Sequence, residues 1–74
     1  MIDLVQFGLY EMYGGEYSGC VFEFNRFEEH EQQFVFRIIY SPYRDAQEVV
    51  GKYVQYTFQD LDQYTFAEVG ECRA

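Results

Sequence analysis

Acids surround the only histidine of the chain, in the run Glu28-Glu29-His30-Glu31. Carboxylates and imidazole are groups that bind metal ions. Neighbouring side chains point apart on a strand and on a helix alike, so these four groups do not converge on one ion. We therefore expect a solvated loop at this point of the chain and no metal site.

The residues needed for nucleophilic catalysis are scarce. A nucleophile requires a base beside it, and Ser18 and Ser41 both occupy turn-like positions, while His30 is the only imidazole. The sequence contains no Gly-rich phosphate loop and no CxxC or HExxH motif. Cys20 and Cys72 lie in a chain that opens without a basic signal region, so we expect reduced thiols and a cytoplasmic protein. The expectation is a protein that is not an enzyme and has no cofactor.

Length and composition indicate one small folded domain, residues 1–74. Hydrophobic residues make up 49% of the 74, and 22% are aromatic, which excludes a disordered acidic tail. Apolar runs such as Phe34-Val35-Phe36 are far shorter than the roughly 20 residues that span a bilayer. The net charge of −8 argues against direct binding to nucleic acid, because Lys and Arg supply most of that affinity.

The first half of the chain is typical of β-strands. Alternating apolar residues predict strands over residues 2–12, 17–25 and 34–40, and the glycine pair Gly14-Gly15 predicts a hairpin between the first two. Cys20, Phe22 and Phe24 share one face of the second strand, and Phe34, Phe36, Ile38 and Tyr40 share one face of the third. The charged residues 26–33 are expected to form a solvated connection.

The second half of the chain allows two interpretations. Apolar residues at helical spacing and an Asp45–Glu48 capping box favour a helix over residues 43–55, whereas the β-forming residues favour a strand over 49–58. The word Gln-Tyr-Thr-Phe occurs at 55–58 and again at 63–66, which suggests an acidic turn between two strand-like segments, the second over 63–69. The prediction is an α+β fold with a small antiparallel sheet of about four strands, beginning with an N-terminal β-hairpin or meander, and one helix around 43–55. An all-β five-stranded barrel is the alternative.

Negative charge is concentrated in the first half of the sequence. Residues 1–31 contain seven acids and one base, whereas residues 32–74 contain six acids and four bases. The acids fall at expected turns, beside Gly14-Gly15, in the connection 26–33, and around residues 59–62. Same-face residues of a strand lie about 6.6 Å apart, close to the spacing of successive phosphates in DNA. Acids on a rigid sheet are therefore able to imitate a phosphate track.

Tyrosine adds a second property of binding surfaces. Tyr13 and Tyr17 flank the glycine pair beside Glu11 and Glu16, and tyrosine is enriched at protein interfaces. We therefore select this turn as the best contact site, together with the other acids. The complete set of candidate partner-binding residues is Glu11, Tyr13, Glu16, Tyr17, Glu23, Glu28, Glu29, Glu31, Asp60 and Asp62.

In size, charge and lack of catalytic motifs the chain resembles the small acidic proteins that phages and mobile elements use against host defences, including anti-CRISPR and anti-restriction proteins. The resemblance implies an inhibitor that blocks the nucleic-acid-binding site of a basic host protein or nuclease complex by mimicking phosphate charge. It implies neither nucleic acid nor a membrane as a direct partner. The alternative is a structural or assembly protein that oligomerises, as a homodimer for example, through its aromatic strands.

Overall fold

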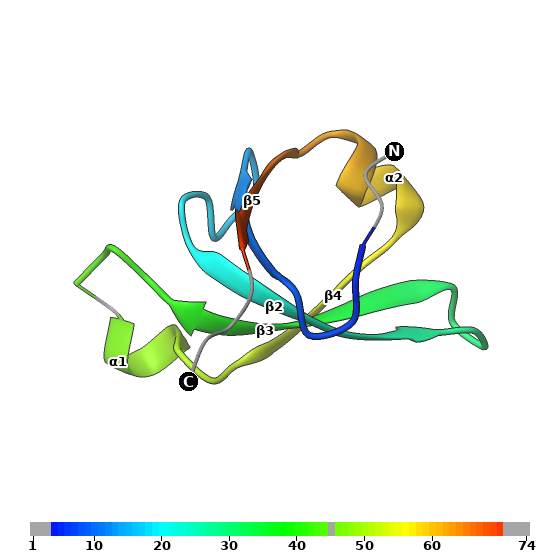
Figure 1. Cartoon of the computed structure of the whole chain (residues 1–74), viewed down its shortest axis with the longest axis horizontal. Coiled ribbons are helices and arrows are strands. Elements are labelled where there is room, and N and C mark those ends of the chain that lie inside the picture. The colour runs from blue at the N-terminus through cyan, green and yellow to red at the C-terminus, as the bar shows by residue number, and fades with distance from the viewer. Residues whose placement is uncertain (1–3, 45, 71–74) are drawn as a thin grey trace.

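Five strands and two short helices form the part of the chain that the computed structural model describes, residues 4–44 and 46–70. In chain order they are β1 (Leu9–Tyr13), β2 (Val21–Glu28), β3 (Gln33–Tyr40), α1 (Ala46–Val49), β4 (Tyr53–Tyr56), α2 (Phe58–Asp62) and β5 (Thr65–Gly70). The strands make one antiparallel sheet in the order β4-β3-β2-β1-β5. The sheet curls strongly (Figure 1) but is not closed into a barrel, because β4 and β5 do not pair with each other.

The predicted hairpin around Gly14-Gly15 is confirmed. Gly14 has a φ of 113°, which favours glycine, and its backbone N–H donates to Ser18 Oγ at 3.1 Å. Gly15 lies so close to the Tyr64 ring that a Cβ there would stand 2.9 Å from it. The β1–β2 loop therefore packs against the chain that leads into β5.

Strand boundaries differ from the prediction at two places. β1 begins only at Leu9, because residues 5–8 form a turn in which the Gly8 N–H donates to the Val5 carbonyl at 2.8 Å. β2 continues to Glu28, so that the charged connection shortens to residues 29–32. A register shift between Phe24 and Arg26 lets β2 continue through the charged residues.

The predicted helix over residues 43–55 is wrong. In the described part of this segment only the four residues of α1 are helical, and Gly51, with a φ of 92°, lies in the turn two residues after the end of α1. The Gly51 N–H donates to the Ile38 carbonyl at 2.6 Å, which brings the chain back to β3. Residues 53–56 then pair with β3 as a strand, as the alternative interpretation predicted. Asp45, the expected helix cap, lies outside the described residues.

A capping box forms instead at Thr57. Its side chain accepts from the Asp60 N–H at 3.2 Å, and the Asp60 carboxylate accepts from the Thr57 N–H at 3.0 Å. The segment expected to be an acidic turn is therefore the short helix α2. The closing strand predicted over 63–69 is present as β5, and the sheet has five strands where about four were expected.

Aromatic side chains fill the concave face of the sheet. Phe22 and Phe36 are almost completely buried, and their rings meet edge-to-face with centroids 6.1 Å apart. Cys20 is buried, and Cys72 lies outside the described residues, so the expectation of reduced cysteines stays a prediction. Tyr40 does not share the face of Phe36 as predicted; it is 55% exposed, because the β2–β3 register shifts beside it. In the part of the chain that is described, no helix is long and apolar enough to cross a membrane.

Candidate partner-binding surfaces

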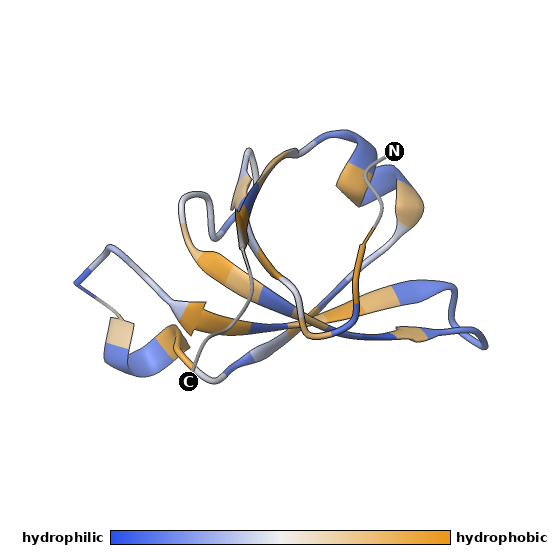
Figure 2. Ribbon diagram, viewed as in Figure 1, coloured by the Kyte–Doolittle hydropathy of each residue, from blue (hydrophilic) through white to orange (hydrophobic). Residues whose placement is uncertain are grey.

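The turn between β2 and β3 carries the densest group of acids. We call Glu28, Glu29 and Glu31 the acidic tip. Glu29 and Glu31 are exposed, and Figure 2 shows the ribbon as hydrophilic at this end of the hairpin. Gln32 closes the turn in a left-handed conformation, with a φ of 56°, and its Nε2 donates to the Glu29 carbonyl at 2.8 Å. This hydrogen bond spans the turn that carries the acidic tip.

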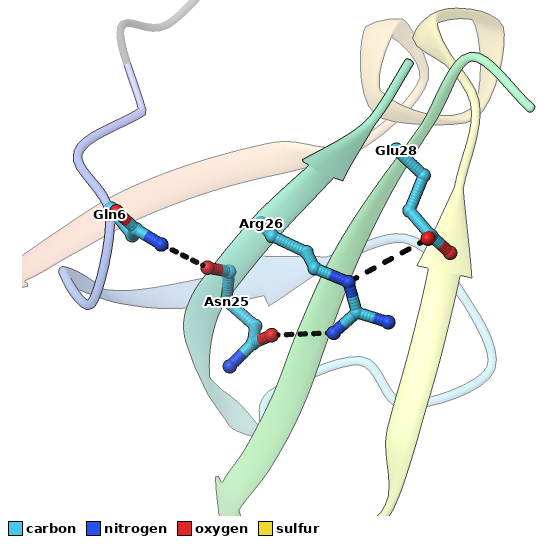
Figure 3. A network of polar contacts seen from close by, with 4 residues as sticks. All are labelled: Gln6, Asn25, Arg26 and Glu28. Atoms are coloured by element: carbon cyan, nitrogen blue, oxygen red, sulfur yellow. Dashed lines mark hydrogen bonds and ion pairs between the residues drawn. The ribbon is translucent and has the colours of Figure 1, made fainter. Parts of the chain in front are cut away.

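A polar network on β2 partly compensates this charge (Figure 3). Arg26 Nε lies 3.7 Å from Glu28 Oε2, and its Nη1 donates to Asn25 Oδ1 at 2.7 Å. Gln6 Nε2 donates to the Asn25 carbonyl at 3.0 Å and so links the segment before β1 to this network. Arg26–Glu28 is the only ion pair among residues 4–44 and 46–70. The uncompensated charge of the tip consequently lies on Glu29 and Glu31.

An aromatic side chain that the sequence analysis did not select lies near the acidic tip. Phe58, the first residue of α2, is 40% exposed. Its ring centroid lies 4.8 Å from that of Phe34 and 5.9 Å from that of Phe27, and these two residues stand opposite each other near the end of the β2–β3 ladder. The only sequence signal was its position after a Thr cap. Phe58 gives this end of the molecule an apolar contact area.

The turn at Gly14-Gly15 has two different sides. Tyr13 is exposed, and its hydroxyl donates to Glu11 Oε1 at 3.2 Å. This hydrogen bond and the charge of the carboxylate raise the pKa of Tyr13 above its ordinary value of 10.0. The structure therefore brings Glu11 and Tyr13 together, as an outward-facing pair of candidate residues.

Tyr17 belongs to the other side of that turn. It is half-buried against the core, and Lys52 Nζ donates to its hydroxyl at 3.4 Å and lies 5.9 Å from its ring centroid. Lys52 thus places a positive charge beside this part of the turn, while Glu16 is exposed. Tyr13 and Tyr17 do not form one surface together.

The remaining candidates are spread over separate elements. Glu23 is half-buried on β2, between Leu9 on β1 and Arg37 on β3 in the ladder. Asp60 is engaged in the capping box, and Asp62 is exposed at the end of α2. No described strand carries two acids at successive positions of one face, since Arg26 follows Glu23 before Glu28 is reached. The acids therefore lie mainly at turns and do not make a phosphate-like row along a strand.

A half-buried tyrosine was also not selected from the sequence. The Tyr56 ring packs edge-to-face on Tyr64 at 5.3 Å and contacts Phe36 at 5.9 Å. Burial, followed by the nearby Tyr64, raises the pKa of Tyr56 well above its ordinary value. The sequence signal for Tyr56 was its place in the first Gln-Tyr-Thr-Phe segment, which was one candidate for a strand. In the structure its side chain faces the core from β4.

Neither the arrangement of possible metal ligands nor a comparison with known proteins gives a further indication of function. Within residues 4–44 and 46–70, no three His, Cys, Asp or Glu side chains are grouped so that they could hold a metal ion. His30 is exposed in the turn of the acidic tip. No family model, no curated protein and no solved structure matches the chain.

Proposed function

We propose that this protein is a non-enzymatic inhibitor that occupies the nucleic-acid-binding site of a basic host protein or nuclease complex. It belongs to the kind of acidic protein that phages and mobile elements direct against host defences, and it acts in the cytoplasm. The observation that carries the proposal is the acidic tip, where exposed Glu29 and Glu31 stand on a hydrogen-bonded turn and Arg26 compensates only Glu28. These carboxylates take the place of phosphates toward Lys and Arg of the partner.

Charge and shape support the same surface. A net charge of −8 accelerates encounter with a basic partner and repels competing acidic surfaces. The tip lies at the end of the longest hairpin of the sheet (Figure 1), so it reaches into a groove shaped for nucleic acid. Phe58 supplies an apolar contact near the charges, and a mixed surface of this kind is typical of protein interfaces.

Capture from lysate treated with nuclease tests the proposal. The immobilised protein is expected to retain a nucleic-acid-binding protein at about 50 mM salt and to lose most of it at several hundred mM. Added duplex DNA or RNA should release the retained protein, because both ligands compete for one site. Retention that is indifferent to salt and to nucleic acid would contradict the proposal.

A matched pair of variants locates the contact. The double variant Glu29→Gln/Glu31→Gln and the control Glu48→Gln/Glu68→Gln change the net charge equally, but the control residues lie on α1 and β5. We expect the tip variant to weaken binding of the captured partner at least tenfold, while the control changes it by less than about threefold. Equal weakening by both variants would show that only the overall charge matters.

A further inference from the structure

The outer edge of β5 is open to another strand. β5 is the last strand in the sheet order, and in the described part of the chain its ladder partner is β1 alone. Thr65, Ala67, Glu68 and Val69 are all exposed. Among residues 4–44 and 46–70, no strand pairs with the outward-pointing N–H and C=O groups of this edge, and such an edge is a template for pairing with a further strand.

This edge has few of the features that usually prevent strand pairing. Proteins protect edge strands with Lys, Pro, β-bulges, several charges or very short length. β5 has six residues in the described part of the chain, and of these only Glu68 is charged. Leu9 and Tyr10 of β1 pair with Gly70 and Glu68, so Val69 is an extra, bulged residue of β5, and this bulge lies beyond Ala67. The other edge, β4, has only four residues and follows directly after Lys52.

We infer that β5 pairs antiparallel with β5 of a second copy of this chain, across a two-fold axis at Ala67. A strand related to itself by a two-fold axis is necessarily antiparallel, which matches every other pairing in the sheet. With Ala67 on the axis, Phe66 stands opposite Glu68 in the regular part of the strand, and Thr65 stands opposite the bulged residue Val69. No like charges face each other directly in this register, and the small Ala67 side chains meet at the centre.

The size and charge of the interface set its strength. A single pair of short strands buries less surface than a standard stable interface, so the dimer is weak and depends on concentration. Two copies of net charge −8 repel each other, and salt screens this repulsion. Salt therefore promotes the dimer, whereas it weakens binding to a basic partner. The inference does not rest on the proposed function, and the opposite salt effects keep the two distinguishable.

Light scattering over a series of concentrations and two salt levels tests the inference. The mean mass is expected to rise toward twice that of the chain with increasing concentration, and more steeply in salt. Ala67→Lys should abolish the rise, because two Lys side chains then meet at the axis. Gln55→Lys makes the same charge change on the edge strand β4 and should leave the rise intact. A wild-type mass that stays monomeric at every concentration and salt level overturns the inference.

Cross-linking tests the register without relying on these variants. Directly opposed residues have Cα atoms about 4.5–5.5 Å apart, which suits a disulfide. With Cys72 replaced by Ser in every sample, Ala67→Cys is expected to form a covalent dimer on mild oxidation. Thr65→Cys should not, because its copy lies four positions away, or about 13 Å along the strand. A Thr65→Cys dimer that forms as fast as the Ala67→Cys dimer, or no Ala67→Cys dimer at all, excludes this pairing.

Discussion

Two residues other than glycine adopt left-handed backbone conformations in the described part of the chain, and one of them, Gln32, lies in the turn of the acidic tip. Phe7 has a φ of 67° and Gln32 a φ of 56°. This region costs an ordinary side chain about 1–2 kcal/mol, so surrounding contacts must hold it. The Phe7 N–H donates to the Phe24 carbonyl at 2.6 Å, and the Gln32 side chain donates to the Glu29 carbonyl. The turn that presents the acidic tip is therefore slightly strained.

Gln32→Gly is expected to stabilise the protein. Glycine adopts the positive φ without steric cost, which outweighs the extra entropy of the unfolded chain and the loss of one exposed hydrogen bond. We expect the free energy of unfolding, measured by urea denaturation, to rise by about 0.5 kcal/mol. The neighbouring change Gln33→Gly, within β3, should lower it by about 0.5–1 kcal/mol. A loss of stability in both variants would contradict the strain at Gln32.

Tyr56 makes stability depend on alkaline pH. Because burial raises the pKa of Tyr56 in the folded state, folding favours its neutral form. This contribution is complete below the unfolded-state pKa of about 10 and is lost as the pH rises toward the folded-state value. Tyr56→Phe should therefore reduce the fall in unfolding free energy between about pH 9 and pH 11. The exposed Tyr53 serves as a control, since Tyr53→Phe should leave that fall nearly unchanged.

At the scale of elements, strands with strict alternation were predictable from the sequence. Phe22 and Phe24, then Phe34 and Phe36, recur at every second position and form the concave core. The segment after residue 43 was not predictable, because Ala46, Val49 and Val50 suit a helix locally while residues 53–56 gain a ladder with β3. The β-forming residues did favour a strand there as the alternative, but the local pattern could not decide between that strand and the helix, because the pairing with β3 is long-range.

The candidate site was predictable only in part. The sequence located the acids at turns, because charged residues interrupt the apolar alternation there. It did not show that Arg26 pairs with Glu28 on β2, because residues 26–33 were expected to be a connection, nor that Tyr17 contacts Lys52. Asp60 was selected as a surface acid, although its carboxylate caps α2. Glu28 and Asp60 are engaged by residues two and three positions away, but these contacts depend on a strand and a helix cap that were not predicted at those positions.

The repeated word Gln-Tyr-Thr-Phe provides an internal control for the capping box. Thr57 caps α2, whereas Thr65, its counterpart eight residues later, opens β5 and is exposed. Thr57→Ala is expected to lower the free energy of unfolding by about 1 kcal/mol, because the Asp60 N–H loses its acceptor. Thr65→Ala should change it by less than about 0.5 kcal/mol. Equal effects in urea denaturation would mean that the box contributes nothing to stability.

At the scale of the whole molecule, the acids exceed the bases by eight and are unevenly placed. Three acids lie within four residues at the acidic tip, while Glu48 and Glu68 lie on separate elements. Repulsion between like charges destabilises the folded state, and salt at about 150 mM screens it beyond about 8 Å. We therefore expect the urea midpoint to rise when salt is added to a dilute sample, in which the protein is monomeric.

The same measurement shows whether the repulsion is local, without any partner. Glu29→Gln/Glu31→Gln and Glu48→Gln/Glu68→Gln leave the same net charge, so a uniform charge distribution predicts equal salt effects for both variants. If the repulsion is concentrated at the tip, Glu29→Gln/Glu31→Gln should be more stable than the wild type in low salt, and salt should change its stability little. Glu48→Gln/Glu68→Gln should keep most of the salt effect. Arg26 offsets only Glu28, so Glu29 and Glu31 carry the charge whose repulsion salt screens. The same two carboxylates would meet a basic partner. Equal behaviour of the two variants would remove the physical basis for assigning the acidic tip as the contact surface.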